Sequence, residues 1–301
     1  MNNTRENLKA KVFHDNDPTL GYEINSFLRK TVNLFLIPIL NLLPVHARKT
    51  IKKSNKFVAE IIDNATTHKA LEILYKKGGS HSSFMGKISH FVWFNTNNSK
   101  AVRNRIKLVK RELKKRLRES IDSKKEISIL SIAAGSARAI IESIIEAKIP
   151  QDIPLRITFL DKSVQALEYS QQLMDDMGLK KRENDRFTWV GETVNTYLKR
   201  EEENYSIIEM VGLMDYFTDD KALTIFKNIH SLLKPGGIFI TANINHNSEK
   251  KFVTKAIGWP MIYREAQHLG HLVHDAGFSE ENIDLFYEPL KIHSVIIARK
   301  K

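Results

Sequence analysis

Six short apolar runs recur through the second half of the chain, and they constrain its fold more than any other feature. Helical patterns, such as those over 164–177 and 220–233, lie between the runs. Strands that alternate with helices form parallel sheets covered on both faces, and right-handed crossovers favour a doubly wound arrangement. The sequence therefore predicts an α/β fold with a mostly parallel sheet. The six predicted strands are residues 127–132, 156–160, 186–190, 205–211, 237–242 and 294–298.

The first 122 residues lack this alternation, and we expect a helical region over 1–122 beside a catalytic domain over 123–301. Residues 31–45 are the most apolar stretch, but two prolines and two asparagines interrupt it. It is too short to span a bilayer. Because short apolar runs usually belong to a core, we expect a buried helix pair packed on the main domain. Basic residues on both sides leave contact with a bilayer interface as the alternative.

A helix is predicted over 57–75, followed by a turn at Gly78-Gly79-Ser80. A longer helix is predicted from Ser99 to Ile121, where apolar residues recur every three or four positions. Its other faces are densely basic, and the formal charge of the chain is +12. Such a run is usually a solvated face, with binding of RNA or a membrane surface as the alternative. The basic residues are Arg103, Arg105, Lys107, Lys110, Arg111, Lys114, Lys115, Arg116 and Arg118.

Small residues and an acid follow the first two predicted strands. Ligands of open α/β sheets bind outside the carboxyl ends of the strands. Residues 131–138 end the first strand, and small residues there let the backbone approach a ligand at a helix N-terminus. The second strand ends on Asp161, 26 residues after Gly135, where a carboxylate can accept hydrogen bonds from ribose hydroxyls. Together these features predict an adenosine-containing ligand.

These segments resemble the signature of class I S-adenosylmethionine-dependent methyltransferases. Residues 131–137 are similar to the glycine-rich first motif, and Asp161 is similar to the ribose-binding acid. Residues 191–192, 212–216 and 232–237 are similar to later motifs of the family. The resemblance implies a seven-stranded Rossmann-like sheet with S-adenosylmethionine as the cofactor. It assigns cofactor binding to Ala133, Ala134, Gly135, Asp161, Lys162, Gly191, Glu192, Val211, Gly212 and Leu213.

The first motif departs from the family pattern at three positions. Family members usually have an acid where Ser131 stands and glycine where Ala133 and Ala137 stand. We therefore expect a variant cofactor site: backbone carbonyls can replace the acid, and alanine permits close approach of a ligand if its backbone angles stay in allowed regions. A protein that binds the cofactor without turnover is the alternative. The Gly-x-Gly-x-x-Gly pattern is absent, which argues against a nicotinamide enzyme.

Residues 97–105 and 258–264 are similar to a bacterial group of putative methyltransferases with a helical N-terminal region. Some relatives in that group are associated with methyl esters of hydroxy fatty acids. This resemblance implies a small-molecule or lipid-like acceptor that is methylated on oxygen. Methylation of RNA through the basic helix is the competing function.

The need for a catalytic base depends on the acceptor. A carboxylate needs none, because positioning and exclusion of water supply most of the rate. For a hydroxyl, His246 after the fifth predicted strand is the candidate base, with a solvated loop histidine as the alternative. Tyr216 is expected to orient the acceptor, and Arg264 to pair with an anionic one.

The composition excludes some chemistry and suggests a location. The chain has no cysteine, so a thiolate nucleophile and the usual thiolate route to pyrimidine C5 are excluded. His268, His271 and His274 share a predicted helix face, but no cluster of acids completes a ligand set, and we expect no metal. Residues 1–7 lack the apolar core of a secretory signal, so we expect a cytoplasmic protein, with peripheral membrane attachment as the alternative.

Overall fold

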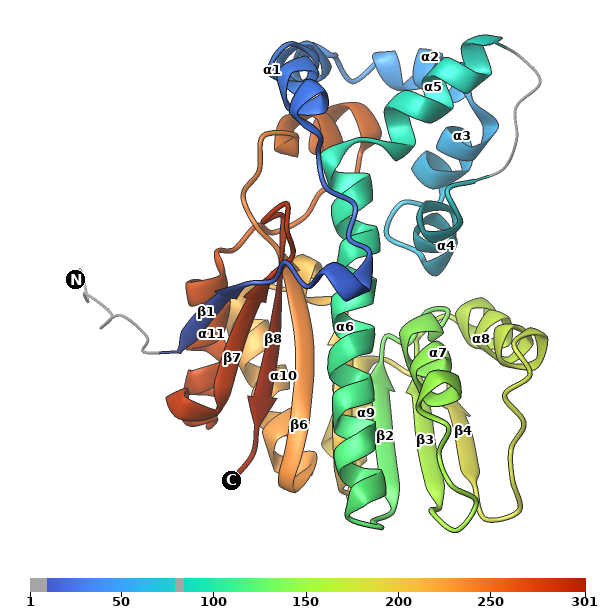
Figure 1. Ribbon diagram of the computed structural model, residues 1–301, viewed down its shortest axis with the longest axis vertical. Helices are drawn as coiled ribbons and strands as arrows, with labels where there is room; N and C mark the ends of the chain where they lie inside the picture. Colours follow the sequence, from blue (N-terminus) through green and yellow to red (C-terminus); the bar gives the residue numbers. More distant parts are fainter. Residues whose placement is uncertain (1–9, 79–83) are drawn as a thin grey trace.

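The structure, a computed structural model, describes residues 10–78 and 84–301 (Figure 1). In this part of the chain the strands form one sheet in the order β1-β7-β8-β6-β5-β2-β3-β4. Strands β2 to β6 are parallel to their neighbours in this group, whereas β8 is antiparallel to both β6 and β7. The strands are β1 (Lys11–His14), β2 (Ile127–Ile132), β3 (Leu155–Leu160), β4 (Arg186–Val190), β5 (Tyr205–Val211), β6 (Leu233–Ile244), β7 (Ile283–Tyr287) and β8 (His293–Arg299).

The predicted doubly wound, mostly parallel α/β sheet is confirmed, but the predicted number of seven strands is wrong. In the described residues the sheet has eight strands, because β1 pairs in parallel with β7 from Lys11↔Asp284 to His14↔Tyr287. Strand β1 has only four residues, and none of them is buried. An apolar run therefore does not mark this edge strand in the sequence.

Two layers of helices cover the sheet. Helices α6, α7 and α8 cover one face, where residues such as Leu113 and Ile157 form a buried core. Helices α9, α10 and α11 cover the other face, which contains Ile208 and Phe226. Burial on both faces explains why β2 is apolar at four of six positions and buried at all six. These helices are α6 (Asn97–Asp122), α7 (Arg138–Ala147), α8 (Val164–Asp176), α9 (Val194–Arg200), α10 (Asp219–Leu232) and α11 (Ala266–Asp275).

The N-terminal helices lie beyond the carboxyl ends of the parallel strands (Figure 1). They are α1 (Phe27–Leu42), α2 (Ala47–Ser54), α3 (Lys56–Asp63), α4 (His68–Lys76) and α5 (Phe84–Phe94). The single helix predicted over 57–75 is therefore two helices, which are separated where Asn64 ends α3 and Thr67 precedes α4. Gly78 has the positive φ of a turn, whereas Gly79 and Ser80 of the predicted turn lie outside the described residues.

The apolar stretch over 31–45 does not form the predicted buried helix pair. It belongs mainly to the single helix α1, which continues through Pro38 and has only Asn33 and Ile37 buried. The prediction is wrong because it took a short apolar run as a sign of burial, whereas most apolar side chains of α1 are exposed. Among the described residues, no helix has the length and apolar character needed to cross a membrane.

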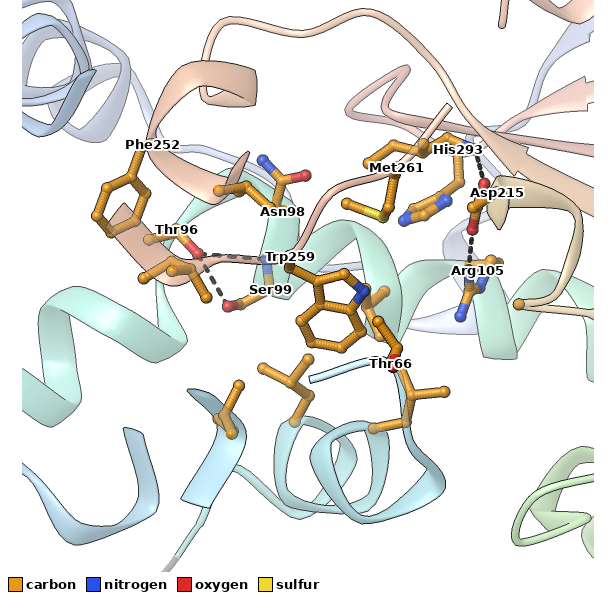
Figure 2. A pocket seen from close by; sticks show the side chains of 18 of the residues that line it. Thr66, Thr96, Asn98, Ser99, Arg105, Asp215, Phe252, Trp259, Met261 and His293 are labelled. Atoms are coloured by element: carbon orange, nitrogen blue, oxygen red, sulfur yellow. Dashed lines mark hydrogen bonds and ion pairs between the residues drawn. The ribbon is translucent and has the colours of Figure 1, made fainter. Parts of the chain in front are cut away.

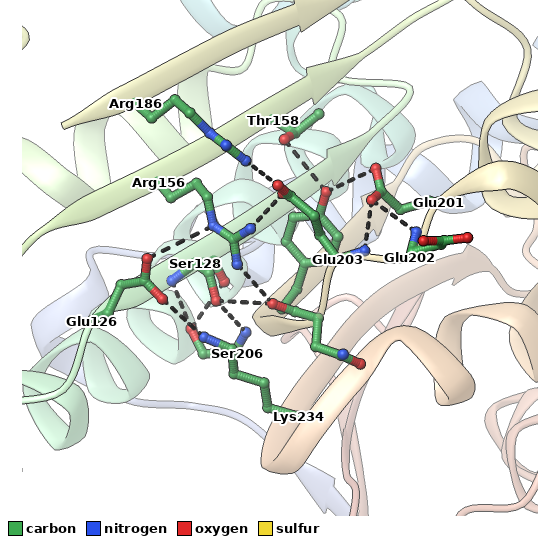
Figure 3. Close-up of polar contacts among 12 residues, drawn as sticks. Glu126, Ser128, Arg156, Thr158, Arg186, Glu201, Glu202, Glu203, Ser206 and Lys234 are labelled. Carbon is green, nitrogen blue, oxygen red and sulfur yellow. Dashed lines mark hydrogen bonds and ion pairs between the residues drawn. The ribbon is translucent and has the colours of Figure 1, made fainter.

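Polar side chains join neighbouring strands at their amino ends (Figure 3). Ser128 and Ser206 each donate a backbone N–H to the hydroxyl of the other, at 3.0 Å in both directions. Arg156 forms an ion pair with Glu203 and donates a hydrogen bond of 2.9 Å to the carbonyl of Asn204. These contacts tie β2, β3 and β5 together at the end opposite the loop that follows β2.

Candidate functional site

The loop between β2 and α7 turns through three left-handed residues. Ala133, Gly135 and Ala137 have φ angles of 52°, 55° and 51°. This conformation suits glycine, and an L-residue adopts it at a cost of about 1–2 kcal/mol. Both alanines therefore lie in the small left-handed region that is allowed to L-residues but seldom occupied by them. A Cβ on Gly135 would lie 3.3 Å from the Cβ of His68 in α4, so glycine also allows this helix to approach the loop.

Asp161 connects the ends of β2 and β3. Its Oδ2 accepts a hydrogen bond of 2.9 Å from the Gly135 N–H, and its Oδ1 accepts one of 2.9 Å from the Ser163 N–H. The two strands pair in parallel with Ile132 opposite Leu160, so the residues that follow them meet at the same edge. Gly135 and Asp161 are thus in direct contact although they are 26 residues apart in the sequence. The carboxylate lies beside the loop that is expected to hold adenosine.

A cavity, here called the loop cavity, opens over the β2–α7 loop. Two of its lining residues are buried and charged: Glu209 of β5 and Arg105 of α6. Glu209 accepts hydrogen bonds from the Ser131 hydroxyl at 2.8 Å and from the Val211 N–H at 3.0 Å. Burial nevertheless raises the pKa of Glu209 to about 7. The lining also includes Ala133 to Ile140, His68, Leu71, Tyr75, Ile106, Val109 and Val211.

The remaining residues assigned to the cofactor lie around the same edge of the sheet. Lys162 and Gly191 are exposed. Glu192 pairs with Arg200 of α9. Val211 lines the loop cavity, whereas Gly212, with φ 91°, lines a second cavity. Leu213 packs against the core formed with α10 and α11.

The second cavity, here called the apolar cavity, lies between the N-terminal helices and the sheet (Figure 2). The empty space within it, including the open solvent at its mouth, is about 740 Å³. Leu71 and Arg105 line both cavities, so the two adjoin. Most of its wall is aliphatic or aromatic: Ile61, Leu71, Leu74, Trp93, Val102, Ile244, Phe252, Val253, Ile257, Trp259 and Met261.

Polar groups gather at one side of the apolar cavity, where Figure 2 shows His293, Asp215 and Arg105 close together. Arg105 Nη1 lies 4.0 Å from Asp215 Oδ2, and both side chains are buried. The Tyr216 hydroxyl accepts a hydrogen bond of 2.6 Å from Trp259 Nε1. Burial raises the pKa of both Asp215 and Tyr216, the latter to about 12.

His293 also lies on this side of the cavity. Both of its ring nitrogens lack a hydrogen-bond partner within residues 10–78 and 84–301. The side chain is buried at the start of β8 and lines the apolar cavity. Burial, with a smaller contribution from the nearby Arg105 charge, holds the pKa of His293 well below its usual value. The imidazole is therefore neutral at neutral pH and has a nitrogen free to accept a proton from a ligand.

Two residues predicted from the sequence to act in catalysis do not line either cavity. His246 is exposed, with its ring 5.8 Å from that of Tyr263. Arg264 is buried and donates to Asp219 Oδ1 at 2.8 Å, to Asn243 Oδ1 at 2.9 Å and to two backbone carbonyls. Its guanidinium connects α10 and β6 to the segment before α11. These contacts are those of a residue that stabilises the fold. Tyr216, the third predicted residue, does line the apolar cavity.

The basic face of α6 is largely occupied within the protein. Arg103 is buried and forms an ion pair with Glu23 at 2.6 Å. Lys110 and Lys114 pair with acids of α7. Arg111 and Arg116 also have acidic partners, whereas Lys115 and Arg118 are exposed. A continuous phosphate-binding track over Arg103 to Arg118 does not fit these contacts.

The histidines of α11 also have partners in the protein. His268 Nε2 lies 2.8 Å from Asp219 Oδ2, and His274 Nδ1 lies 3.0 Å from the carbonyl of Phe278. No group of three or more potential metal-ligating side chains occurs in the part of the chain that the structure describes.

Sequence patterns did not reveal Glu209, Arg105 or His293 as candidate site residues. Glu209 is the one charged residue of the buried strand β5, which was the available signal. Arg105 belongs to a run of similar cations, and the sequence does not distinguish the buried ones. His293 is the first residue of β8, which is antiparallel to β6 and therefore begins at the edge where the parallel strands end; the sequence did not indicate the direction of this strand.

Comparisons with known proteins agree with this geometry. A family described as putative methyltransferases matches residues 62–300. No curated protein matches the chain significantly.

Three solved structures illustrate the likeness in fold. A protein from Bordetella parapertussis described as a possible exported protein is 15% identical, with TM-score 0.62, over 79% of this chain and 80% of that one. The magnesium protoporphyrin IX methyltransferase of Synechocystis, solved with S-adenosylhomocysteine, is 11% identical, with TM-score 0.53, over 76% and 92%. A putative O-methyltransferase from Nostoc punctiforme is 16% identical, with TM-score 0.50, over 76% and 66%. The chain belongs to the putative methyltransferase family and is an S-adenosylmethionine-dependent methyltransferase of class I fold.

Proposed function

We propose that this methyltransferase methylates an oxygen atom of an apolar small molecule held in the apolar cavity. The observation that supports this proposal is that the loop cavity and the apolar cavity adjoin at Leu71 and Arg105. Methyl transfer requires the donor and acceptor to lie in contact and in line, with water excluded. Two adjoining cavities, one polar and one apolar, are suited to that requirement.

The residues around the loop cavity fit the two ends of S-adenosylmethionine. Asp161 lies beside the Gly135 backbone, where its carboxylate can accept hydrogen bonds from ribose hydroxyls. Glu209 and Arg105 supply one buried acid and one buried guanidinium, which suit the amino and carboxylate groups of the methionine end. Arg105 Nε has no hydrogen-bond partner among the described residues, and the cofactor carboxylate would supply an acceptor for it. When bound, the cofactor supplies a methyl group activated by its sulfonium.

We place the acceptor hydroxyl next to His293. A neutral imidazole can accept the proton that the hydroxyl loses as its oxygen becomes methylated. Tyr216, which is fixed by Trp259 at 2.6 Å, lies on the same cavity wall and can orient the acceptor. The aliphatic and aromatic side chains of this cavity exclude water and favour an apolar acceptor body.

RNA is a less suitable acceptor because the cations that would bind its phosphates already have partners. Arg103, Lys110 and Lys114 are paired with acids of this chain. A phosphate track needs several free cations along one face.

The first test is calorimetric titration with S-adenosylmethionine and S-adenosylhomocysteine, followed by transfer of a labelled methyl group to long-chain alcohols, phenols, fatty acids and RNA. We expect binding of both cofactor forms and transfer to a hydroxyl. Replacing His293→Gln should lower kcat by about 100-fold and leave cofactor affinity unchanged. His246→Gln is the matched control and should retain activity.

Other outcomes would reject specific parts of this proposal. Transfer to fatty acids at an unchanged rate in His293→Gln would identify a carboxylate acceptor that needs no base. Cofactor binding without transfer to any acceptor in the panel would favour a non-catalytic role.

A further inference from the structure

Helix α1 is apolar on the side that faces away from the protein. Among the described residues, eleven of the fourteen exposed large hydrophobic side chains lie between Ile24 and Phe91. Six of them belong to the apolar face of α1, defined here as Phe27, Leu28, Leu34, Phe35, Ile39 and Leu42, which are 59–87% exposed. At 100° per residue these six positions fall on one side of the helix. An ordinary surface helix has the opposite arrangement.

Three polar side chains of α1 face the protein instead. Asn33 is buried and donates a hydrogen bond of 3.2 Å to Asn97 Oδ1. Asn41 donates to the Ser248 carbonyl at 2.7 Å and accepts from the Phe252 N–H at 2.9 Å. Arg29 donates to the Asn95 carbonyl at 3.0 Å. These bonds fix the rotation of the helix about its axis, so its apolar face is held outward.

The surroundings of this face are exclusively basic in sequence. Residues 24–59 contain seven Lys or Arg residues and no Asp or Glu. Lys30 of α1 and Lys49 and Lys53 of α2 are exposed. Helices α1, α2 and α5 form the end of the molecule furthest from the sheet, and α5 adds the exposed Ile88 and Phe91 (Figure 1). Lys52 is paired with Asp63 of α3, whereas the three exposed lysines add positive charge to an apolar end of the protein.

We propose that the apolar face of α1 inserts into the interface of an anionic lipid bilayer, with the lysines of α1 and α2 at the headgroups. A helix of 16 residues is about 24 Å long, so it can lie in the plane of the interface. Anionic headgroups complement the exposed Lys30, Lys49 and Lys53, whereas a second copy of this surface would oppose them with like charge.

The same helix adjoins the apolar cavity. Asn41 bonds to the backbone of Phe252, and the Phe252 side chain lines that cavity. A bilayer seated on α1 would therefore lie near a pocket suited to an apolar molecule. The bilayer contact itself does not depend on which acceptor that pocket binds.

The experiment is co-sedimentation of the full chain with vesicles of phosphatidylcholine alone or of phosphatidylcholine mixed with phosphatidylglycerol. We expect binding to the anionic vesicles, weakened by salt. The neutral double variant Leu34→Gln with Phe35→Gln should weaken it about tenfold or more. Both side chains are over 70% exposed, so the melting temperature should not fall, and cofactor affinity should not change.

A second pair of variants tests the charge. Lys49→Gln with Lys53→Gln should weaken binding to anionic vesicles, whereas Lys180→Gln with Lys181→Gln removes the same charge at exposed positions after α8 and should have little effect. Failure to bind anionic vesicles, or binding that the Leu34 and Phe35 substitutions leave unchanged, would overturn the proposal. So would a dimer in solution that those two substitutions dissociate.

Discussion

The Ser131 hydroxyl donates a hydrogen bond of 2.8 Å to the Glu209 carboxylate across the paired strands β2 and β5. The two residues are directly opposite in the register of the sheet. Class I methyltransferases that the sequence resembles usually have an acid where Ser131 stands. In this chain the neighbouring strand supplies a carboxylate at the same level of the sheet, and the hydroxyl holds it in place.

Replacing Glu209→Gln should weaken S-adenosylmethionine binding by about tenfold, because the cofactor amino group would lose a charged hydrogen-bond partner. Calorimetry measures this change directly. Methylthioadenosine has no amino-acid end, so its affinity should be the same for both proteins. A parallel loss of methylthioadenosine binding would mean that the substitution disturbs the whole site.

The stability of the cofactor-free protein should depend on pH through Glu209. Burial raises its pKa from 4.5 to about 7 in the folded state, so between these values the folded protein holds a proton that the unfolded chain has released. The free energy of unfolding should therefore fall as pH rises from about 4.5 to about 7, by on the order of 3 kcal/mol from this group. Urea unfolding of Glu209→Gln should show a smaller loss over the same range. If the free energy of unfolding depended on pH equally in the two proteins, the Glu209 carboxylate would be better solvated than its burial implies.

Replacing Ala133→Gly should stabilise the protein by about 0.5–1 kcal/mol, because glycine relieves the left-handed φ of 52° but adds freedom to the unfolded chain. Thermal unfolding reports the change. The matched control is Ala134→Gly, which has no positive φ to relieve and should destabilise the protein. A lower melting temperature for Ala133→Gly than for the natural protein would contradict the expected strain.

Replacing Arg264→Ala should destabilise the protein by about 3 kcal/mol, because Asn243 and two carbonyls would lose a buried donor. Urea midpoints measure the loss, with the exposed His246→Ala as a control that should be neutral. The folded fraction should keep its KM for the acceptor. A raised KM at unchanged stability would instead indicate that Arg264 contacts the acceptor.

The parallel part of the fold was predictable because its buried strands are mainly apolar, as in β2 and β5. Strand β1 was not, since an exposed edge strand of four residues leaves no such run. The apolar residues of α1 led to the wrong prediction of a buried helix pair over residues 31–45. Periodicity identifies an apolar face, but the bonds of Asn33 and Asn41 decide whether that face is buried.

The residues of the candidate site that directly follow predicted strands could be expected from the sequence. Those that reach the site only through tertiary packing could not. Asp161 follows a strand next to the β2–α7 loop, so its spacing from Gly135 carried the information. Glu209 and His293 reach the cavities from β5 and from the antiparallel β8, and Arg105 reaches them from a helix outside the sheet. Their convergence follows from tertiary contacts that one sequence does not specify.

Helix α6 carries Arg105 at the point where the two cavities meet, while its later turns are packed on the sheet. Each residue of an α-helix turns the side-chain direction by about 100°. Deleting one residue between Arg105 and Leu113 would thus rotate the guanidinium away from both cavities, while the turns after Leu113 stayed packed on the sheet. The rotation of this one helix about its axis decides whether Arg105 lies between the cofactor and the acceptor. Insertions and deletions among related proteins should therefore occur in the loops around the helix and not within it.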